Sequence, residues 1–311
     1  MSGLVLVVGD ANPDLVLSGD VVPRFGQAEQ LLDDAALRVG GSAAITAHGL
    51  ARLNRPVALL AAVGTDSLAQ SLLTELGSAG VCLDQIVQRH DQPTGLTVVL
   101  SRAADRAMLT HTGAIPSLTA TELRDAVATL ADRGLRHVHV ASLFLQPTLA
   151  ATLPGVLAEI RARGVTVSLD TNDDPAGRWQ GVAELLPYVD VLLPNDREAL
   201  ALAGGAVDVE DAARTLAAHG PLVVVTRGER GAIAVGPGGT VTTVAATPVD
   251  PVDTTGAGDT FTAAFLDTWL AGAPVSHCLH RAVLAGAAAV RAIGGTAGQP
   301  AATDLPPRKG R

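Results

Sequence analysis

The sequence predicts an α/β protein with a doubly wound, mostly parallel sheet and a small β lid. Short apolar runs rich in β-branched residues alternate with longer helical patterns, as they do when parallel strands are buried between helices. Two segments, 17–39 and 93–112, instead contain short alternating strand and turn patterns without helices, so we expect them to pair into the lid. The 311 residues, 48% of them hydrophobic, suffice for one large or two modest domains.

The main domain is expected to comprise residues 1–16, 40–92 and 113–311, and the lid the two segments between them. The hydrophobic patterns predict strands at Leu4–Val8, Val57–Val63, Thr97–Leu100, His137–Ser142, Thr166–Asp170, Val189–Leu193, Leu222–Thr226 and Ala232–Val235. They predict helices at Ser42–Leu53, Ser67–Ala79, Glu122–Leu130, Thr148–Arg163, Glu198–Ala203, Val209–Ala218, Gly258–Ala271 and Val275–Ala292. Ligands of such sheets bind at the carboxyl ends of the strands.

Composition excludes several classes of function. A net charge of −9 argues against a nucleic-acid or anionic-membrane partner. The N-terminal run ends at Asp10 without a preceding basic region, and no apolar run approaches the roughly 18 residues of a membrane span, so we expect a cytoplasmic protein. Cys82 and Cys278 show no disulfide or metal-ligand spacing and are expected to be buried thiols. The only lysine is Lys309, so neither a P-loop nor a pyridoxal-phosphate site can be built.

The stretch VDTTGAGDTFTAAFL, from Val252 to Leu266, places a glycine turn directly before a helical pattern. Glycines let the backbone approach a ligand closely, and the unpaired first amides of a helix attract an anion. Asp259 would lie at the edge of this anion cradle, ionised at neutral pH, where a carboxylate can act as a general base toward a phosphoryl acceptor. The local alternative is a plain helix start with Asp259 as a stabilising first-turn acid.

Five ordered motifs resemble those of the ribokinase-like (PfkB) carbohydrate kinase family. DTTGAGDTF resembles its C-terminal signature, and GGSAAITAHGLARL, which starts at Gly40, resembles its N-terminal diglycine signature. LLPNDREAL, VTRGERGA and GDANPDLVL resemble its Asn-x-x-Glu motif, nucleotide loop and opening strand. Together they cover almost the whole chain, and the resemblance implies a ribokinase-like fold of three layers.

The resemblance also implies the parts of a phosphoryl transfer. Asp259 would deprotonate the acceptor hydroxyl, and the amides of Gly256, Ala257 and Gly258 would hold the transferring phosphoryl group. Asn195 and Glu198 would hold Mg²⁺, partly through water, since Mg²⁺ keeps much of its hydration shell. Local sequence favours a different interpretation of this pair, a helix N-cap followed by a capping-box acid.

ATP is the implied phosphoryl donor. The family motif would place it at Thr226, Gly228 and Gly231, with Asn195 nearby, although a strand followed by an ordinary turn explains the first three residues equally well. Asp253 resembles the position that touches the sugar and lines a monovalent-cation site, which K⁺ would occupy. Its alternative is a turn-forming aspartate close to a proline.

The acceptor side would be formed mainly by the opening strand and the diglycine turn. The resemblance implies that Asn12, Asp14, Gly40 and Gly41 contact the sugar, and one departure is Ile45, where many family members have an asparagine. Asp170 and Asn172 resemble a segment that lines the path between acceptor and nucleotide, or they form an Asx turn. His111 could contact substrate but is better explained as a solvated hinge residue.

The sequence thus predicts ATP-dependent phosphorylation of a small sugar or sugar acid, such as ribose, fructose or 2-keto-3-deoxygluconate. One alternative is a nucleoside such as adenosine, although aromatics, which would stack on the base, are only 2% of the residues. Another is a non-catalytic sugar or nucleotide sensor. The lid's strand edges need covering, and a homodimer through the lids would cover them.

Overall fold

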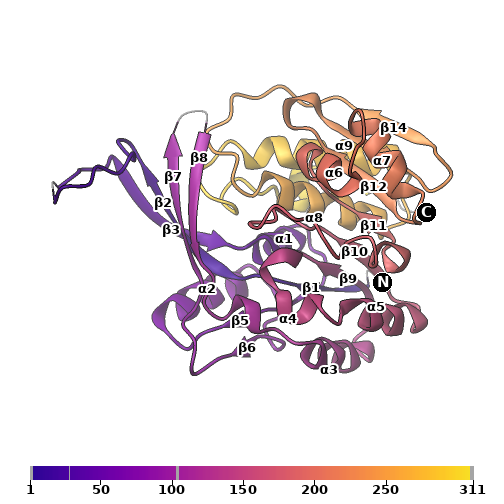
Figure 1. The fold of residues 1–311 in the computed structure, drawn as a ribbon, viewed down its shortest axis with the longest axis horizontal. Helices are drawn as coiled ribbons and strands as arrows, with labels where there is room; N and C mark the ends of the chain where they lie inside the picture. The colour runs from indigo at the N-terminus through magenta and orange to yellow at the C-terminus, as the bar shows by residue number, and fades with distance from the viewer. Residues whose placement is uncertain (1–2, 28, 103–104, 309–311) are drawn as a thin grey trace.

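The computed structural model, which describes residues 3–27, 29–102 and 105–308, confirms an α/β fold with a large, mostly parallel sheet (Figure 1). This sheet has the strand order β14-β13-β12-β11-β10-β9-β1-β4. Six neighbouring strands run parallel: β4 (Val57–Leu60), β1 (Leu4–Val8), β9 (Leu135–Val140), β10 (Thr166–Leu169), β11 (Val191–Leu192) and β12 (Leu222–Thr226). At one end of the sheet, β13 (Ala232–Val235) pairs antiparallel with β12, and the edge strand β14 (Val241–Val244) pairs antiparallel with β13.

Helices cover both faces of the sheet, because successive side chains of a strand point to opposite faces. In β1, Leu6 and Val8 belong to one buried apolar cluster and Val5 and Val7 to another. The cluster of Leu6 is completed by α3 (Ala120–Ala131), α5 (Leu153–Ala162), α6 (Asp196–Ala203) and α7 (Val209–Ala217). The opposite face is covered by α1 (Ser42–Arg52), α2 (Ser67–Ser78), α8 (Ala257–Trp269) and α9 (Val275–Ala289).

A separate four-stranded sheet projects from the main body, at the left of Figure 1. Its order is β3-β2-β7-β8, and it is formed by β3 (Asp34–Gly40), β2 (Asn12–Ser18), β7 (Leu96–Arg102) and β8 (Asp105–His111). Only β2 and β7 are parallel, so the sheet is mixed. It is the small β lid that the sequence predicts, and β2 enters it at Asn12, five residues before the start of the expected segment 17–39.

Several element boundaries differ from the prediction. The helix expected at 148–163 is interrupted between α4 (Pro147–Ala150) and α5, because Pro154, in the first turn of α5, cannot donate the amide that a continuous helix needs. The strand expected at 57–63 divides into β4 and β5 (Ala62–Val63), which pairs with β6 (Val87–Gln88). β14 was not predicted. The remaining elements are the short helical turns η1 (Ile115–Ser117), η2 (Leu143–Leu145), η3 (Leu186–Tyr188), η4 (Gly228–Arg230) and η5 (Ala302–Asp304).

An acidic side chain at the far end of α8 ties several segments together. The Asp267 side chain is 0% exposed and accepts hydrogen bonds from Arg55 Nε at 3.0 Å, Arg281 Nη1 at 3.2 Å and Arg308 Nε at 2.6 Å. Arg308 also donates to the carbonyl of Leu53. The carboxylate therefore links α8 to α9, to the segment after α1 and to the C-terminal segment.

The structure also tests the expectations for the two cysteines and for membrane-spanning helices. Cys278 is buried as expected, but the expectation of a buried thiol is wrong for Cys82, which is only half-buried. Among the residues that the structure describes, no helix combines the length and the apolar character needed to cross a membrane.

Candidate active site

Polar side chains follow several parallel strands at the edge where these strands end. Asp10 comes two residues after β1, Asp170 directly after β10, and Asn195 three residues after β11, while Thr226 ends β12. The carboxyl ends of neighbouring parallel strands meet at one edge, where ligands of such sheets bind. The fold thus gathers residues from distant parts of the sequence at this edge.

The start of α8 offers an open backbone turn. Its N-cap is Gly256, with φ 70° and no side-chain capping hydrogen bond. A Cβ at Gly256 would lie 2.5 Å from the carbonyl oxygen of Gly295, so this position requires glycine for both its conformation and its close packing. A Cβ at Gly258 would meet nothing within 4 Å. The first turn of α8 is therefore open at Gly258, where an anion can approach the helix N-terminus, although the amide of Ala257 also donates to the carbonyl of Thr254 at 3.4 Å.

Asp259 lies in the first turn of α8 and is partly buried. Ser42 Oγ donates a hydrogen bond to Asp259 Oδ1, and Asn172 Nδ2 donates to Ser42 Oγ at 3.1 Å. Burial raises the pKa of Asp259 to about 7, and the hydrogen bond from Ser42 opposes this rise. The expectation of a fully ionised Asp259 at neutral pH is therefore wrong for this state, because desolvation outweighs the stabilising contacts.

Asp10 and Ser42 are site residues that the sequence analysis missed. The backbone amide of Ala43 donates to Asp10 Oδ1 at 3.0 Å, so Asp10 supplies the cap that Gly41, the N-cap residue of α1, lacks. Burial raises the pKa of Asp10. Their positions in the sequence were the available signal: Asp10 is an acid two residues after the first strand, and Ser42 is a hydroxyl directly after the diglycine.

Asn12 and Asp14 form the root of the lid strand β2. Asn12 Nδ2 donates to Asp14 Oδ1 at 3.0 Å and to Thr97 Oγ1 at 3.1 Å, which fixes the orientation of the Asp14 carboxyl. Burial, followed by the nearby charge of Asp10, raises the pKa of Asp14 to about 7. A Cβ at Gly40 would clash with this carboxyl, so glycine is required for the close approach of β3 to Asp14. Gly41 has φ 83°, and a Cβ there would lie 2.7 Å from the carbonyl oxygen of Asp10.

Asn195 and Glu198 form the capping box that local sequence favours. The amide of Glu198 donates to Asn195 Oδ1 at 2.9 Å, and the amide of Asn195 donates to Glu198 Oε2 at 2.9 Å. Glu198 is nevertheless buried, and burial raises its pKa. Burial, followed by the charge of Glu198, raises the pKa of Asp170 well above its usual value.

The donor set around Glu198 fits a hard divalent cation. Glu198 and Asp170 are both buried carboxylates, and each would be stabilised in its charged form by a cation between them. Mg²⁺ prefers oxygen ligands and retains waters, so it does not need a complete protein cage. Among the described residues no group of three or more His, Cys, Asp or Glu side chains forms such a cage.

A pocket of about 620 Å³ adjoins the start of α8. Three of the expected nucleotide-binding residues, Thr226, Gly228 and Gly231, line it together with Ala257 and Gly258. The pocket is otherwise mainly apolar, with Pro248, Val249, Phe261, Val283, Ala287 and Val290 among the lining residues. Asn195 does not line it, although it forms an isolated β-bridge with Thr226.

Three other positions from the sequence analysis lie near this edge. Asp253 Oδ1 accepts hydrogen bonds from the amide and hydroxyl of Thr255, and Oδ2 accepts one from the amide of Gly294 at 2.8 Å, so Asp253 shapes its turn. Ile45 is buried, and its side chain lies close to Gly295. His111 is exposed at the end of β8.

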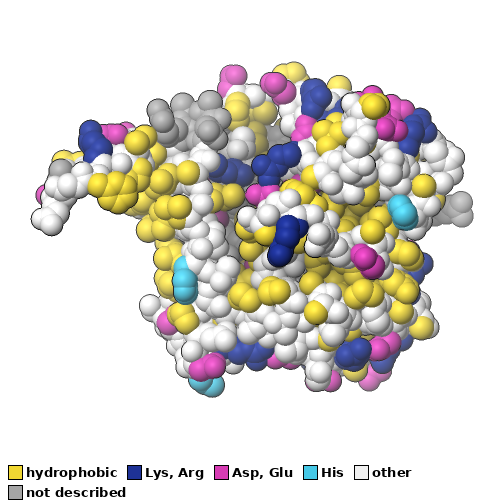
Figure 2. All heavy atoms as spheres, in the orientation of Figure 1, with side chains coloured by type: hydrophobic (Ala, Val, Ile, Leu, Met, Phe, Trp, Pro, Cys, Tyr) yellow, Lys and Arg dark blue, Asp and Glu magenta, His cyan; other side chains and the backbone are white. Residues whose placement is uncertain are grey.

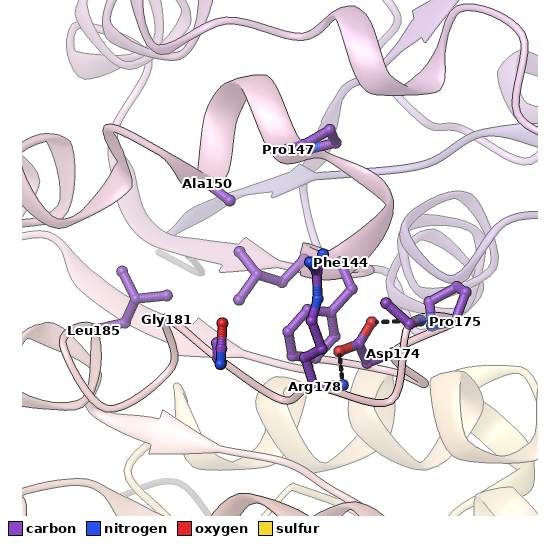
Figure 3. A pocket seen from close by; sticks show the side chains of 11 residues that line it. Phe144, Pro147, Ala150, Asp174, Pro175, Arg178, Gly181 and Leu185 are labelled. Carbon is purple, nitrogen blue, oxygen red and sulfur yellow. Dashed lines mark hydrogen bonds between the residues drawn. The ribbon is translucent and has the colours of Figure 1, made fainter.

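The surface is hollowed between the lid and the main domain, and Figure 2 shows acidic and basic side chains gathered in this hollow. A second pocket, of about 360 Å³, lies between α4 and residues 174–181 of the loop that follows β10 (Figure 3). Asp174 lines it and accepts backbone hydrogen bonds from Ala176 and Arg178, with Phe144 beside them. None of the predicted site residues lines the second pocket, so it is separate from the candidate site.

Comparisons with known proteins agree with this geometry. A model of the pfkB family of carbohydrate kinases matches residues 2–302. An ATP-dependent ribose-1-phosphate kinase of Halopiger xanaduensis is 32% identical over 286 residues, which cover 91% of this chain and 90% of that protein. Arabidopsis thaliana ribokinase, solved with ribose and ATP, superposes with a TM-score of 0.84 at 26% identity over 97% of both chains. An E. coli protein solved with ATP and Mg²⁺ has the same fold, with a TM-score of 0.85 at 22% identity over 97% of both chains.

Proposed function

Because the chain belongs to the pfkB family of carbohydrate kinases and is an ATP-dependent sugar kinase, we propose that Asp259 is its general base and that the acceptor is a small sugar or sugar acid. One observation carries the proposal. Asp259 is partly buried in the first turn of α8, accepts a hydrogen bond from Ser42, and directly follows Ala257 and Gly258, which line the 620 Å³ pocket.

The proposed reaction is an in-line transfer from ATP. Asp259 takes the proton of an acceptor hydroxyl, and the oxygen attacks the γ-phosphorus while the bond from that phosphorus to the β,γ-bridging oxygen breaks and ADP leaves. The amides of Gly256, Ala257 and Gly258 donate to the oxygens of the transferring group. Donors that are fixed before the reaction stabilise the transition state without reorganisation.

The nucleotide would occupy the pocket lined by Thr226, Gly228 and Gly231. Mg²⁺ would supply charge neutralisation to its phosphates. Glu198 and Asn195 would hold the ion's water shell, and Asp170 would face it from the end of β10. This assignment rests on the buried, mutually repelling carboxylates of Glu198 and Asp170.

The acceptor would lie between the lid and the main domain. Asn12, Asp14, Gly40, Gly41 and Asp253 would contact it, the carboxylates accepting from sugar hydroxyls. A pentose-like acceptor is supported by the names of the similar proteins, which act on ribose 1-phosphate or bind ribose. Closure of segments 17–39 and 93–112 over it would exclude water and suppress hydrolysis of ATP.

The test is coupled ADP production with Mg-ATP against pentoses, hexoses, sugar acids and nucleosides, with and without K⁺. We expect turnover of a sugar or sugar acid, and Asp259→Asn should lower kcat by about 10²–10⁴-fold with little change in the KM for ATP. Turnover that survives this substitution would contradict the role of Asp259. If a nucleoside were the preferred acceptor, the proposed acceptor class would be wrong. Activation by K⁺ would support a cation site near Asp253.

A homodimer through the lids is part of the proposal. Its support is a group of exposed apolar side chains on the lid, at Val22, Phe25, Leu31, Leu37, Met108 and Leu109. Such a group is typical of protein interfaces. Light scattering at micromolar protein should give twice the mass of one chain, and Leu109→Glu should reduce it. A monomeric mass for the wild type would count against the dimer.

A further inference from the structure

One lid arginine reaches across to the turn that precedes the anion cradle. Arg106 lies on β8, and its Nη1 donates to Thr254 Oγ1 at 3.0 Å and to Thr255 Oγ1 at 3.1 Å. The same nitrogen is 3.9 Å from Asp253 Oδ1. The Arg106 side chain is 32% exposed, so a solute in the hollow between lid and main domain can still reach it.

A second lid arginine approaches the same turn from the opposite edge of the lid sheet. Arg38 lies on β3, and β3 and β8 are the two outer strands of that sheet. A Cβ at Gly294 would lie 2.8 Å from Arg38 Cγ, so the side chain passes directly over this glycine. The amide of Gly294 in turn donates to Asp253 Oδ2. The lid therefore brings the charge of Arg106 and the aliphatic stem of Arg38 to the turn around Asp253.

The charge of Arg106 lies beside the carboxyls that would surround the acceptor. Burial raises the pKa of Asp14 and of Asp259 to about 7, and in both cases the charge of Arg106 opposes the rise. Arg106 is thus within electrostatic reach of both the lid-root acid and the general base. On the turn, Arg106 makes hydrogen bonds to two neutral hydroxyls, which an anion could replace, in addition to its longer ion pair with Asp253.

A neutral sugar would not need this arrangement. Its hydroxyls are recognised well by carboxylates and amides such as Asp14 and Asn12, whereas a guanidinium matches the planar, bidentate geometry of a carboxylate or the oxygens of a phosphate. An acceptor that carries its own negative charge would also be repelled by Asp14 and Asp259 unless a positive charge accompanied it. Arg106 is placed to supply that charge.

We propose that Arg106 is a specificity residue that selects acceptors bearing an anionic group, a phosphate or a carboxylate, on the sugar. The inference rests on the proposed function and narrows its acceptor class. The phosphoryl transfer itself is unchanged: the hydroxyl proton goes to Asp259, and the acceptor's own anion stays intact on Arg106.

The test compares acceptors that differ in charge. Ribose is compared with ribose 1-phosphate, fructose with fructose 6-phosphate, and glucose with 2-keto-3-deoxygluconate. The first two pairs test recognition of a phosphate, and the third tests recognition of a carboxylate. We expect the wild type to prefer the anionic member of at least one pair by about tenfold or more in kcat/KM, as a charge-assisted hydrogen bond allows. Arg106→Gln should lower the preference for the anionic over the neutral member of that pair by about tenfold or more, measured well above pH 7, where Asp259 is ionised in both proteins.

Controls separate this role from folding and from lid closure. Arg24→Gln removes an exposed lid arginine that pairs with Asp20, and it should leave the preference unchanged. Arg106→Lys keeps the charge and should retain part of the preference. The inference would be overturned if the wild type preferred the neutral acceptor in every pair. It would also be overturned if Arg106→Gln lowered kcat/KM equally for all acceptors, because Arg106 would then act in lid closure or on the transferring phosphoryl group.

Binding measurements distinguish this inference from the proposed function. Calorimetry with Asp259→Asn reports acceptor affinity without turnover, and the anionic member should bind about tenfold more tightly than its neutral partner. Adding Arg106→Gln should abolish the difference. Equal affinities in every pair, or no binding of any anionic acceptor, would refute the role of Arg106 even where Asp259 proves to be the base.

Discussion

Ser42 Oγ donates a hydrogen bond to Asp259 Oδ1, and the same hydroxyl accepts one from Asn172 Nδ2. This relay joins the first turn of α1 to the first turn of α8 and to the loop after β10. It fixes one carboxylate oxygen of Asp259, so the other is the one that can face an acceptor. Ser42 is therefore a positioning residue for the proposed base.

Replacement of Ser42 by alanine should make the kinase more sensitive to acid. The hydrogen bond from Ser42 lowers the pKa of Asp259, so its loss moves the acidic limb of kcat/KM to higher pH. We expect about fivefold less activity at pH 6, in line with one lost hydrogen bond, and a smaller loss at pH 9. Ser78→Ala, at the end of α2, is the matched control and should leave the profile unchanged.

The wild-type pH profile follows from the raised pKa values. Asp259 must be deprotonated to accept a proton, and its pKa in the free protein is about 7. We expect kcat/KM to rise about tenfold per pH unit below that value and to level off above it. The pKa of Asp14 is also about 7, so the acidic limb of the kcat/KM profile reflects the ionisation of both carboxyls together. A flat profile between pH 5.5 and 8 would be incompatible with this assignment.

Asp259→Asn should stabilise the fold at alkaline pH. The folded pKa of about 7 lies above the ordinary value of 3.8, so ionisation of Asp259 destabilises the fold progressively from about pH 4 to 7 and fully above 7. The variant should therefore exceed the wild type in Tm by about 2–4 °C at pH 8 and by much less at pH 4.5. Thermal unfolding at the two pH values checks this, and an equal difference at both would contradict the buried-charge explanation.

Glu198→Gln separates the metal role from the capping role. Glutamine can keep the capping box, but it removes the charge that would attract Mg²⁺. We expect the Mg²⁺ concentration for half-maximal activity to rise about tenfold or more, with little change in Tm. Glu122→Gln is the matched control, because Thr119 and Glu122 form the same capping box on α3. An equal effect of the two substitutions on Mg²⁺ dependence would indicate that Glu198 only caps its helix.

Asp267→Asn should be among the most destabilising single substitutions. It removes the negative charge that three arginines share in a buried site. Loss of one partner of a buried ion pair costs about 3–5 kcal/mol of unfolding free energy, and chemical denaturation measures it. Glu159→Gln, which removes the partner of Arg124 at the surface, should cost less than about 1 kcal/mol. A comparable loss in both variants would show that burial is not what matters.

The fold and the glycine turn could be predicted because both depend on local patterns. Periodicity separates buried strands from helices, and a glycine turn before a helix is visible in GAGD. The relay of Ser42 and Asn172 could not be predicted, because it depends on how α1 and the loop after β10 approach α8. The pKa of Asp259 was misjudged for the same reason: the sequence reveals its neighbours along the chain but not the depth of its burial.

The Asn195–Glu198 pair illustrates another limit. The capping box that local sequence favours is present, and the proposed metal role depends on Asp170, which comes from a different strand. Arg106 gave no sequence signal, because nothing in the pattern around it differs from that of an ordinary exposed strand residue. Its position opposite Thr254 and Thr255 arises only when the lid meets the main domain.

The distance in sequence between Ser42 and Asp259, 217 positions, has a consequence for synthesis of the protein. The chain emerges from the ribosome with α1 long before α8, yet α1 packs tightly on α8, where a Cβ at Gly49 would lie 2.9 Å from Ala263 Cβ. Until α8 arrives, this face of α1 is uncovered, and such non-local contacts slow folding. With the proposed role of Asp259, a nascent chain cannot phosphorylate its acceptor before Asp259 has left the ribosome.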